Sequence, residues 1–247
     1  ARVWTAVLLV SVTAATARGP RPYQEDRSVI TVHGDTVLLA VLDGHGGADV
    51  AEHCALHLRA LEDLPTTEAN IYRLVRDLAI EVADHEAGST LSLMVIRPDA
   101  AIVAVLGDSP VLMFDIDGRF HVGPEHNVRT NLAERKAAVA RGGVYSNGYI
   151  WDGMHGPGLM MSRALGDVEL RGILSYTPAV CTIPSPRWAL ITSDGALDPG
   201  HAETDALIDD VRRLVDDAAT TADDVLAWAI LRGLADNATA LLWRRDV

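Results

Sequence analysis

The chain has 247 residues, of which 49% are apolar, and its 34 acidic and 21 basic side chains give a formal net charge of −13. This length allows one large domain or two small ones, and the apolar content is ample for a sizeable core. The acidic balance disfavours nucleic acid or an anionic membrane surface as the main partner. The only two cysteines, Cys54 and Cys181, make no disulfide framework and indicate a reducing compartment.

The N-terminal residues support two interpretations. Arg2, the apolar run Val7–Val12 and the small residues Ala15–Ala17 loosely imitate a signal peptide. The same region is rich in Val, Thr and Trp, which favour strands, and we predict a first strand over Trp4–Thr13. The apolar stretch is far too short to span a bilayer. The chain does not begin with Met, which is compatible with further residues ahead of Ala1.

Strand-like runs and amphipathic helices occur in separate clusters along the chain. The predicted strands are Trp4–Thr13, Ser28–His33, Val37–Leu42, Thr90–Ile96, Ala101–Leu106, Val111–Phe114, Leu159–Met161, Trp188–Thr192 and Ala238–Trp243. The predicted helices are Ala48–Leu61, Glu68–Asp84, Leu132–Ala140, Asp205–Val215 and Ala222–Leu231. Asp117-Gly118 predicts a hairpin turn before Arg119–Val122. This clustering favours packed sheets flanked by helices, and no domain boundary is evident.

Several of these strand-like runs stop or start at an aspartate beside a small or polar residue. Asp43, Asp108 and Asp194 follow such runs, and Asp236 precedes one. A strand end does not need a carboxylate, because burying an unpaired charge is costly. If these ends meet at one rim, they concentrate negative charge that only cations can offset. The pattern therefore suggests a hard-metal site built from oxygen ligands.

Glycines and a further acidic pair strengthen this interpretation. Glu25-Asp26 adds a fifth acidic position, and the glycines after Asp43 and Asp194 let the backbone bend so that a carbonyl can also reach a metal. One Asp-Gly pair alone predicts an ordinary turn, but five such positions together argue against that explanation. Two Mg²⁺ or Mn²⁺ ions about 3.5–4 Å apart can activate a water and clamp a phosphoryl group.

Eight short segments carry this chemistry in order along the chain. They are Arg21–Asp26, Asp43–Gly47, Ala87–Thr90, Gly107–Ser109, Gly142–Val144, Ser162–Asp167, Ser193–Gly195 with Asp198, and Asp236–Thr239. The ordered set resembles the metal-dependent protein phosphatases of type 2C and covers most of the chain from Arg21 to Trp243. The resemblance implies an α+β fold, a four-layer αββα sandwich of two antiparallel sheets flanked by helices. It also implies a single catalytic domain over residues 1–247.

The resemblance further implies a binuclear Mg²⁺ or Mn²⁺ site at one end of the paired sheets. In that arrangement Asp43 would bridge both ions. Asp194 and Asp236 would hold one ion, and Glu25 with the carbonyl of Gly44 would hold the other.

Four further roles follow from the same resemblance. Asp108, with Asp194, would hold a third and weaker ion, and Asp26 would orient metal-bound waters. Arg21 would grip the substrate phosphate, for which a guanidinium fork is suited. His45 would protonate the leaving oxygen, since its pKa lies near working pH.

The implied function is a serine/threonine phosphoprotein phosphatase in which water attacks phosphorus directly. The alternative is a non-catalytic, metal-containing binding module on the same fold. We expect phosphorylated proteins as substrates, no nucleic-acid or membrane partner, and a monomer in the cytoplasm. Gln24 and Pro110 replace the Asn and Arg that are common in the family, but no metal ligand is missing. Residues 125–158 correspond to a variable flap, so substrate preference does not follow from the resemblance.

Three other patterns have ordinary explanations. His53 and His57 lie four apart on a predicted helix and could share a metal, but no third ligand is evident. Cys181 and Arg187 have the spacing of cysteine-dependent phosphatases, but two prolines between them remove amides that such a phosphate cradle requires. Asn237–Thr239 is formally a glycosylation sequon, but it lies inside the predicted metal motif.

Overall fold

The structure is a computed structural model that describes residues 10–154, 158–200 and 204–245. The strands in this part of the chain are β1 Val10–Ala17, β2 Arg27–His33, β3 Thr36–Leu42, β4 Gly44–His45, β5 Gly88–Ser89, β6 Leu91–Ile96, β7 Ala100–Leu106, β8 Val111–Asp115, β9 Phe120–Val122, β10 Val144–Ser146, β11 Tyr149–Trp151, β12 Leu165–Gly166, β13 Ala179–Pro184, β14 Pro186–Thr192 and β15 Ala238–Arg245. The helices are α1 Asp49–Arg59, α2 Glu68–Glu81, α3 Leu132–Ala140, the 3-10 turn η1 Val168–Leu170, α4 Asp194–Leu197, α5 Thr204–Asp216 and α6 Ala222–Leu231.

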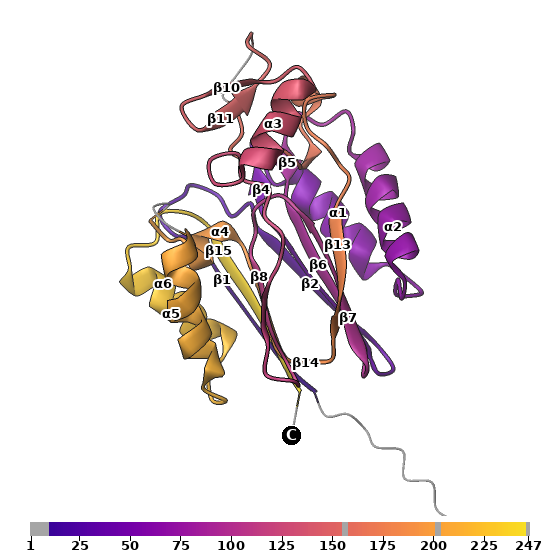
Figure 1. Ribbon diagram of the computed structural model, residues 1–247, viewed down its shortest axis with the longest axis vertical. Helices are drawn as coiled ribbons and strands as arrows, with labels where there is room; N and C mark the ends of the chain where they lie inside the picture. Colours follow the sequence, from indigo (N-terminus) through magenta and orange to yellow (C-terminus); the bar gives the residue numbers. More distant parts are fainter. Residues whose placement is uncertain (1–9, 155–157, 201–203, 246–247) are drawn as a thin grey trace, which may run out of the picture.

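Two antiparallel five-stranded sheets form the centre of the molecule (Figure 1). One sheet has the order β1-β15-β14-β8-β9, and the other has the order β13-β7-β6-β3-β2. Helices α1 and α2 pack on the outer face of the second sheet, while α4, α5 and α6 pack on the outer face of the first. A shared apolar cluster joins the inner faces of the two sheets. The layers confirm the predicted αββα sandwich.

The residues of β3 show why this sequence builds two cores from one strand. Leu38 and Leu42 pack toward α1 and α2, whereas Leu39 and Val41 pack toward the facing sheet. Successive side chains of a strand point to opposite faces, so a strand buried on both sides must be apolar throughout. Fully burying each such side chain contributes about 1.5–3 kcal/mol. The unbroken apolar run Val37–Leu42 is therefore explained by its central position.

The N-terminal strand is confirmed in part, with shifted bounds. β1 pairs antiparallel with β15 from Val10, opposite Arg245, to Ala17, opposite Ala238. The small residues at 15–17, which resembled a cleavage site, lie inside this strand. The rest of the predicted strand, residues 4–9, lies outside the described residues. Among the described residues, no helix is long and apolar enough to cross a membrane.

Other boundaries show where local pattern was sufficient and where it was not. The predicted helices over 132–140 and 222–231 coincide with α3 and α6. The predicted strand Leu159–Met161 is wrong, because these residues form only isolated bridges to Ile150 and Asn127. Edge strand β13 was not predicted, since five of its six residues remain partly or fully exposed and it ends on a proline.

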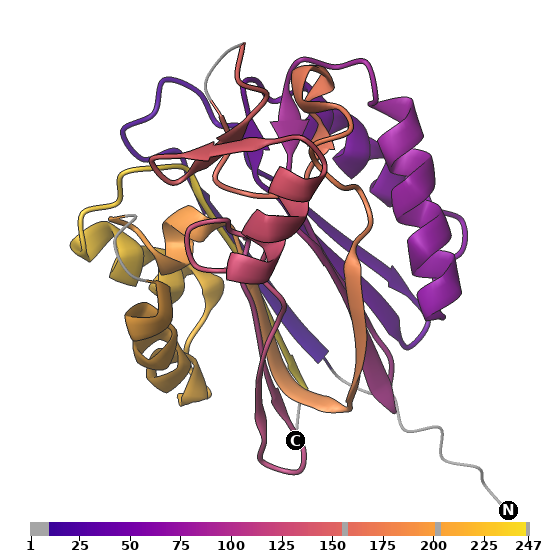
Figure 2. The same cartoon turned by 45° about the horizontal axis from the view of Figure 1, so that its top comes forward.

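The strand ends next to the predicted acidic residues lie together at one end of the sandwich. The register places Arg27 opposite Leu42, and Leu91 opposite Leu106, in one sheet. In the facing sheet, Ala240 lies beside Thr192. Above this rim lie α3, β10 and β11, which belong to a smaller lobe with its own apolar core (Figure 2). The rim and the lobe together frame the candidate site.

Candidate metal and phosphate site

The structure brings the predicted acidic residues to this rim. Asp43 follows β3, Asp108 lies two residues after the end of β7, and Asp194 begins α4 two residues after the end of β14. Asp26 precedes β2, and Asp236 lies two residues before β15. Asp43 lies close enough to the four other carboxylates for each to act on its charge. The prediction that these strand ends converge is therefore confirmed, while the role of each residue stays a prediction.

Burial and mutual repulsion at the rim disfavour the ionised forms of these carboxylates. Removal from water raises the pKa of Asp43 well above its usual value, and the charges of Asp26 and Asp194 raise it further. Burial is also the main reason that the pKa of Asp26 rises to about 6, and burial with the charge of Asp194 raises the pKa of Asp108 to about 6. Nearby cations would relieve this repulsion.

Asp26 shows most directly that a cationic or donor group fits here. Its Oδ2 accepts a hydrogen bond of 2.7 Å from the hydroxyl of Ser193, which joins the two sheets at the rim. Its buried Oδ1 has no hydrogen-bond donor among the described residues. A buried acceptor without a partner is costly, so the site suits an ion or an ordered water. The donor set is all oxygen, which matches a hard divalent cation.

The carboxylates lie near one another, but they do not form a complete set of metal ligands around one position. Among the described residues, no three His, Cys, Asp or Glu side chains form a ready-made metal-binding group.

Asn237 holds the Arg21–Asp26 segment in place, a role that the sequence analysis missed. Its Oδ1 accepts a hydrogen bond of 2.7 Å from the backbone N–H of Glu25. Its Nδ2 donates to the carbonyls of Arg18 at 2.8 Å and Tyr23 at 3.0 Å. The side chain is buried and committed to these bonds, so its presence in a sequon has a structural explanation. In the sequence, only its position next to the predicted ligand Asp236 could have indicated this role.

Two glycines allow the close approaches on which the rim depends. A Cβ at Gly44 would lie 2.6 Å from the carbonyl oxygen of Glu25, and a Cβ at Gly195 would lie 2.1 Å from that of Asn237. Neither distance is tolerable for a real side chain. Gly44 therefore lets its own backbone pack closely against that of Glu25, the residue predicted to share one ion with it. Gly195 lets α4 pack against the start of β15.

Arg21 lies at the same rim. Its Nη2 donates to Oδ2 of Asp236 at 2.5 Å, and the side chain is about half exposed. The guanidinium predicted to bind phosphate is thus beside a carboxylate predicted to bind metal. This placement is consistent with a group that reaches a phosphoester held at the ions.

His45 is fixed by a carboxylate that the sequence analysis recognised only as part of a motif. Its Nε2 lies 2.9 and 3.0 Å from the two carboxylate oxygens of Asp167. Asp167 adopts a left-handed backbone conformation with φ of 54°. A Cβ at Gly88 would lie 2.1 Å from Oδ2 of Asp167, so only glycine leaves room for this contact. The strained Asp167 and Gly88 together orient the imidazole.

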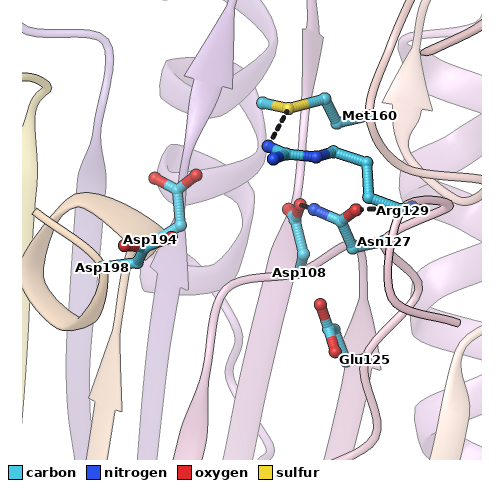
Figure 3. A pocket seen from close by; sticks show the side chains of 7 residues that line it. All are labelled: Asp108, Glu125, Asn127, Arg129, Met160, Asp194 and Asp198. Carbon is cyan, nitrogen blue, oxygen red and sulfur yellow. Dashed lines mark hydrogen bonds between the residues drawn. The ribbon is translucent and has the colours of Figure 1, made fainter. Parts of the chain in front are cut away.

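Figure 3 shows the pocket in which the predicted third ion would lie. The carboxylates of Asp108, Asp194 and Asp198 line it, and the cavity measures about 30 Å³. Asn127 donates from Nδ2 to Oδ2 of Asp108 at 2.8 Å, and Arg129 contacts the sulfur of Met160 at 3.6 Å. This volume is about that of one water, so a single ion is of suitable size.

The loop after this pocket keeps its place despite the proline that departs from the family pattern. The carbonyl of Pro110 accepts a hydrogen bond of 3.0 Å from the N–H of Thr192 in β14.

The competing patterns have structural roles. His53 and His57 both contact Oε2 of Glu81, at 2.9 and 3.0 Å, across the α1–α2 surface. Cys181 lies in strand β13, where burial raises the pKa of its thiol and the charge of Glu68 raises it further. A cysteine nucleophile requires the opposite shift. These groups lie outside the candidate site.

Comparison with known proteins identifies the family. The family model for protein phosphatase 2C matches residues 33–238. The chain belongs to the protein phosphatase 2C family. A "Probable protein phosphatase 2C 71" from Arabidopsis thaliana is 26% identical over 93% of this chain and 54% of its own length. A "Probable protein phosphatase 2C 45" from Oryza sativa subsp. japonica is 27% identical over 93% of this chain and 86% of its own length.

Solved structures of family members share the fold. A serine-threonine phosphatase 2C from Toxoplasma gondii superposes with a TM-score of 0.75 at 18% identity, covering 96% of this chain and 95% of that one. A serine/threonine phosphatase from Staphylococcus aureus gives a TM-score of 0.72 at 16% identity, covering 100% and 99%. The family consists of metal-dependent serine/threonine protein phosphatases, and this chain has their catalytic fold.

Asp108→Asn is expected to stabilise the metal-free protein at pH 7 but to change its stability little at pH 4. The folded-state pKa of Asp108 is raised to about 6 from 3.8, so folding takes up a proton between these values. The free energy of unfolding therefore falls as pH rises from about 4 through 6, and Asn removes this loss.

Thermal melts in chelator at both pH values would check this expectation. Adding Mn²⁺ at pH 7 should raise the wild-type midpoint, since a ligand at one hundred times its Kd adds about 2.7 kcal/mol. The same change in midpoint for Asp108→Asn at pH 4 and pH 7 would contradict the expectation.

Proposed function

We propose that the chain is the catalytic domain of a Mg²⁺- or Mn²⁺-dependent serine/threonine protein phosphatase that uses two ions and a third, weaker one. Asp43 would hold both principal ions, Asp194 and Asp236 one of them, and Glu25 with the Gly44 carbonyl the other. The observation that carries the proposal is the convergence of carboxylates at one rim with raised pKa values. Such a group is costly without cations and serves no purpose in packing.

The chain's own residues supply the rest of the reaction. When bound, the ions activate a water near neutral pH and offset the charge of the phosphoryl group. Arg21 binds the phosphate oxygens through charge-assisted hydrogen bonds. Asp26, whose Oδ1 lacks a donor among the described residues, accepts a hydrogen bond from the attacking water and orients it. His45, held by Asp167, donates a proton to the leaving oxygen of the serine or threonine.

The wider setting belongs to the same proposal. Residues 1–247 would form one catalytic domain that works as a monomer in the cytoplasm on phosphorylated proteins, without nucleic-acid or membrane partners. Loss of Asp43, Asp194 or Asp236 would have supported the non-catalytic alternative, yet all three residues are present.

A phosphatase assay with matched phosphopeptides tests the proposed function. We expect hydrolysis of phosphoserine and phosphothreonine peptides with Mg²⁺ or Mn²⁺, loss of activity with chelator, and recovery when the metal is restored. Activity that persists undiminished after exhaustive chelation would overturn the metal-dependent mechanism. A protein that binds Mn²⁺ but turns over no phosphoester would support the binding module instead.

Arg21→Ala is expected to lower kcat/KM by roughly 10- to 150-fold, because a charge-assisted hydrogen bond contributes about 1.5–3 kcal/mol. The loss should be similar for phosphopeptides and for an aryl phosphate, since the contact is to the phosphate and not to the leaving group. Arg76→Ala, which removes a surface pair with Asp77, is the matched control and should keep full activity. A loss confined to peptides would place Arg21 in peptide recognition.

A further inference from the structure

His45 also lines a second cavity. It measures about 310 Å³, which is within the range of ligand pockets. The lining residues are His45 at the end of β4, Gly46 after it, Glu86 before β5, and Asp167 with Glu169 near β12 and η1. Because His45 lines this cleft and is the proposed proton donor to the leaving group, residues next to the phosphorylated side chain would lie beside the cleft.

The cleft combines an acidic rim with an apolar surface. Glu86 and Glu169 are exposed, and neither forms an ion pair or a side-chain hydrogen bond with a described residue. Leu159 and Leu170 also line the cleft and supply apolar surface. Asp167 is already engaged with His45, so Glu86 and Glu169 are the charges left to meet a ligand.

Lysine and arginine side chains match this combination. Their aliphatic stems pack on apolar surface while their charged ends reach a polar rim. An acidic side chain would meet the like charges of Glu86 and Glu169, and a purely apolar one would leave these two carboxylates unmatched. The net charge of −13 adds a general attraction for basic segments.

We propose that this cleft binds a Lys or Arg side chain next to the phosphorylated residue, so that the preferred substrates are phosphoproteins with basic residues flanking phosphoserine or phosphothreonine. The inference rests on the proposed phosphatase function and deepens it. Glu86 and Glu169 are then specificity-determining residues, whereas Arg21 and the ions act on any phosphoester.

The test compares three phosphoserine peptides that differ only in having Arg, Gln or Glu at the flanking positions. The wild-type protein with Mn²⁺ should give kcat/KM in the order Arg, Gln, Glu. Two exposed ion pairs correspond to roughly a 2- to 30-fold advantage of the Arg peptide over the Gln peptide. High salt should reduce this advantage, because exposed charges are screened.

Paired variants separate the cleft from the charge of the whole molecule. The double change Glu86→Gln with Glu169→Gln should remove most of the advantage of the Arg peptide. The double change Glu62→Gln with Asp63→Asn alters the net charge equally at exposed positions after α1, and should preserve the advantage. Hydrolysis of an aryl phosphate, which has no side chain to place in the cleft, serves as the reference rate for each protein.

Three results would overturn the inference. Equal kcat/KM for the Arg and Gln peptides would show that the cleft does not select basic residues. Equal effects of the two double changes would assign the preference to net charge. A loss of aryl phosphate hydrolysis as large as the loss on the Arg peptide would place Glu86 and Glu169 in the support of the catalytic centre. Failure of the proposed function itself has a different signature, the absence of metal-dependent hydrolysis of every substrate, including the aryl phosphate.

Discussion

Asp43→Asn and Asp236→Asn are each expected to lower turnover by about 10³-fold or more, since the several kcal/mol that a bound metal contributes corresponds to that factor. Asp43 lies among four other carboxylates at the rim, and Asn retains its shape while removing the charge that would hold both ions. The metal-free Asp43→Asn protein should also be at least as stable as the wild type, because one repelling charge is removed from the rim.

Steady-state rates with saturating Mn²⁺, together with circular dichroism and thermal melts, check both parts of this expectation. Asp35→Asn, at an exposed position in the β2–β3 turn, is the matched control and should keep full activity. A folded Asp43→Asn protein that retains most of its turnover at saturating Mn²⁺ would exclude the proposed bridging role. A variant that fails to fold would leave Asp236→Asn, which lies outside any regular element, as the deciding change.

Much of the fold could be predicted because its strands are buried on both faces. The runs Val37–Leu42 and Ala101–Leu106 contain only apolar residues, and β3 and β7 lie in the middle of a sheet between helices and a second sheet. The layer order itself came from the resemblance, since clusters of strands and helices are compatible with several arrangements of packed sheets.

Some strands that were not predicted from the sequence are too short to show a hydrophobic pattern. Strands β4, β5 and β12 have two residues each, so no periodicity can reveal them. They nevertheless form a three-stranded sheet that places His45 opposite Gly88 and Gly88 opposite Gly166. Pairing over such short segments is decided by tertiary contacts and not by intrinsic propensity.

The acidic residues of the candidate site could be predicted from the sequence, but the hydrogen bonds that position them and His45 could not. Acidic residues at strand ends are visible in the sequence, and the register brings them to one rim. The hydrogen bonds of Asn237 and the contact between Asp167 and His45 join residues more than 100 positions apart. Such contacts depend on the fold as a whole. The acidic cleft beside His45 depends in the same way on residues from four separate segments.

His45→Ala is expected to lower kcat on a phosphoserine peptide by roughly 10²–10⁴-fold, the usual contribution of a general acid. Serine alkoxide is a poor leaving group and needs a proton as the bond to phosphorus breaks. The imidazole lies two residues after Asp43 and is held by both oxygens of Asp167, so it is oriented before substrate binds. An activated aryl phosphate leaves without protonation and should lose much less activity.

The ratio of the two losses is therefore the decisive measurement, because it separates proton donation from damage to the metal site. Damage to the nearby Asp43 and Gly44 would slow both substrates equally, whereas loss of the acid should slow only the peptide. His57→Gln, which removes a surface contact with Glu81, is the matched control and should change neither rate. Asp167→Asn should produce a weaker version of the His45→Ala pattern, since it loosens the ring without removing it. Equal losses on both substrates for His45→Ala would reject its role as the general acid and assign it to the structure of the rim.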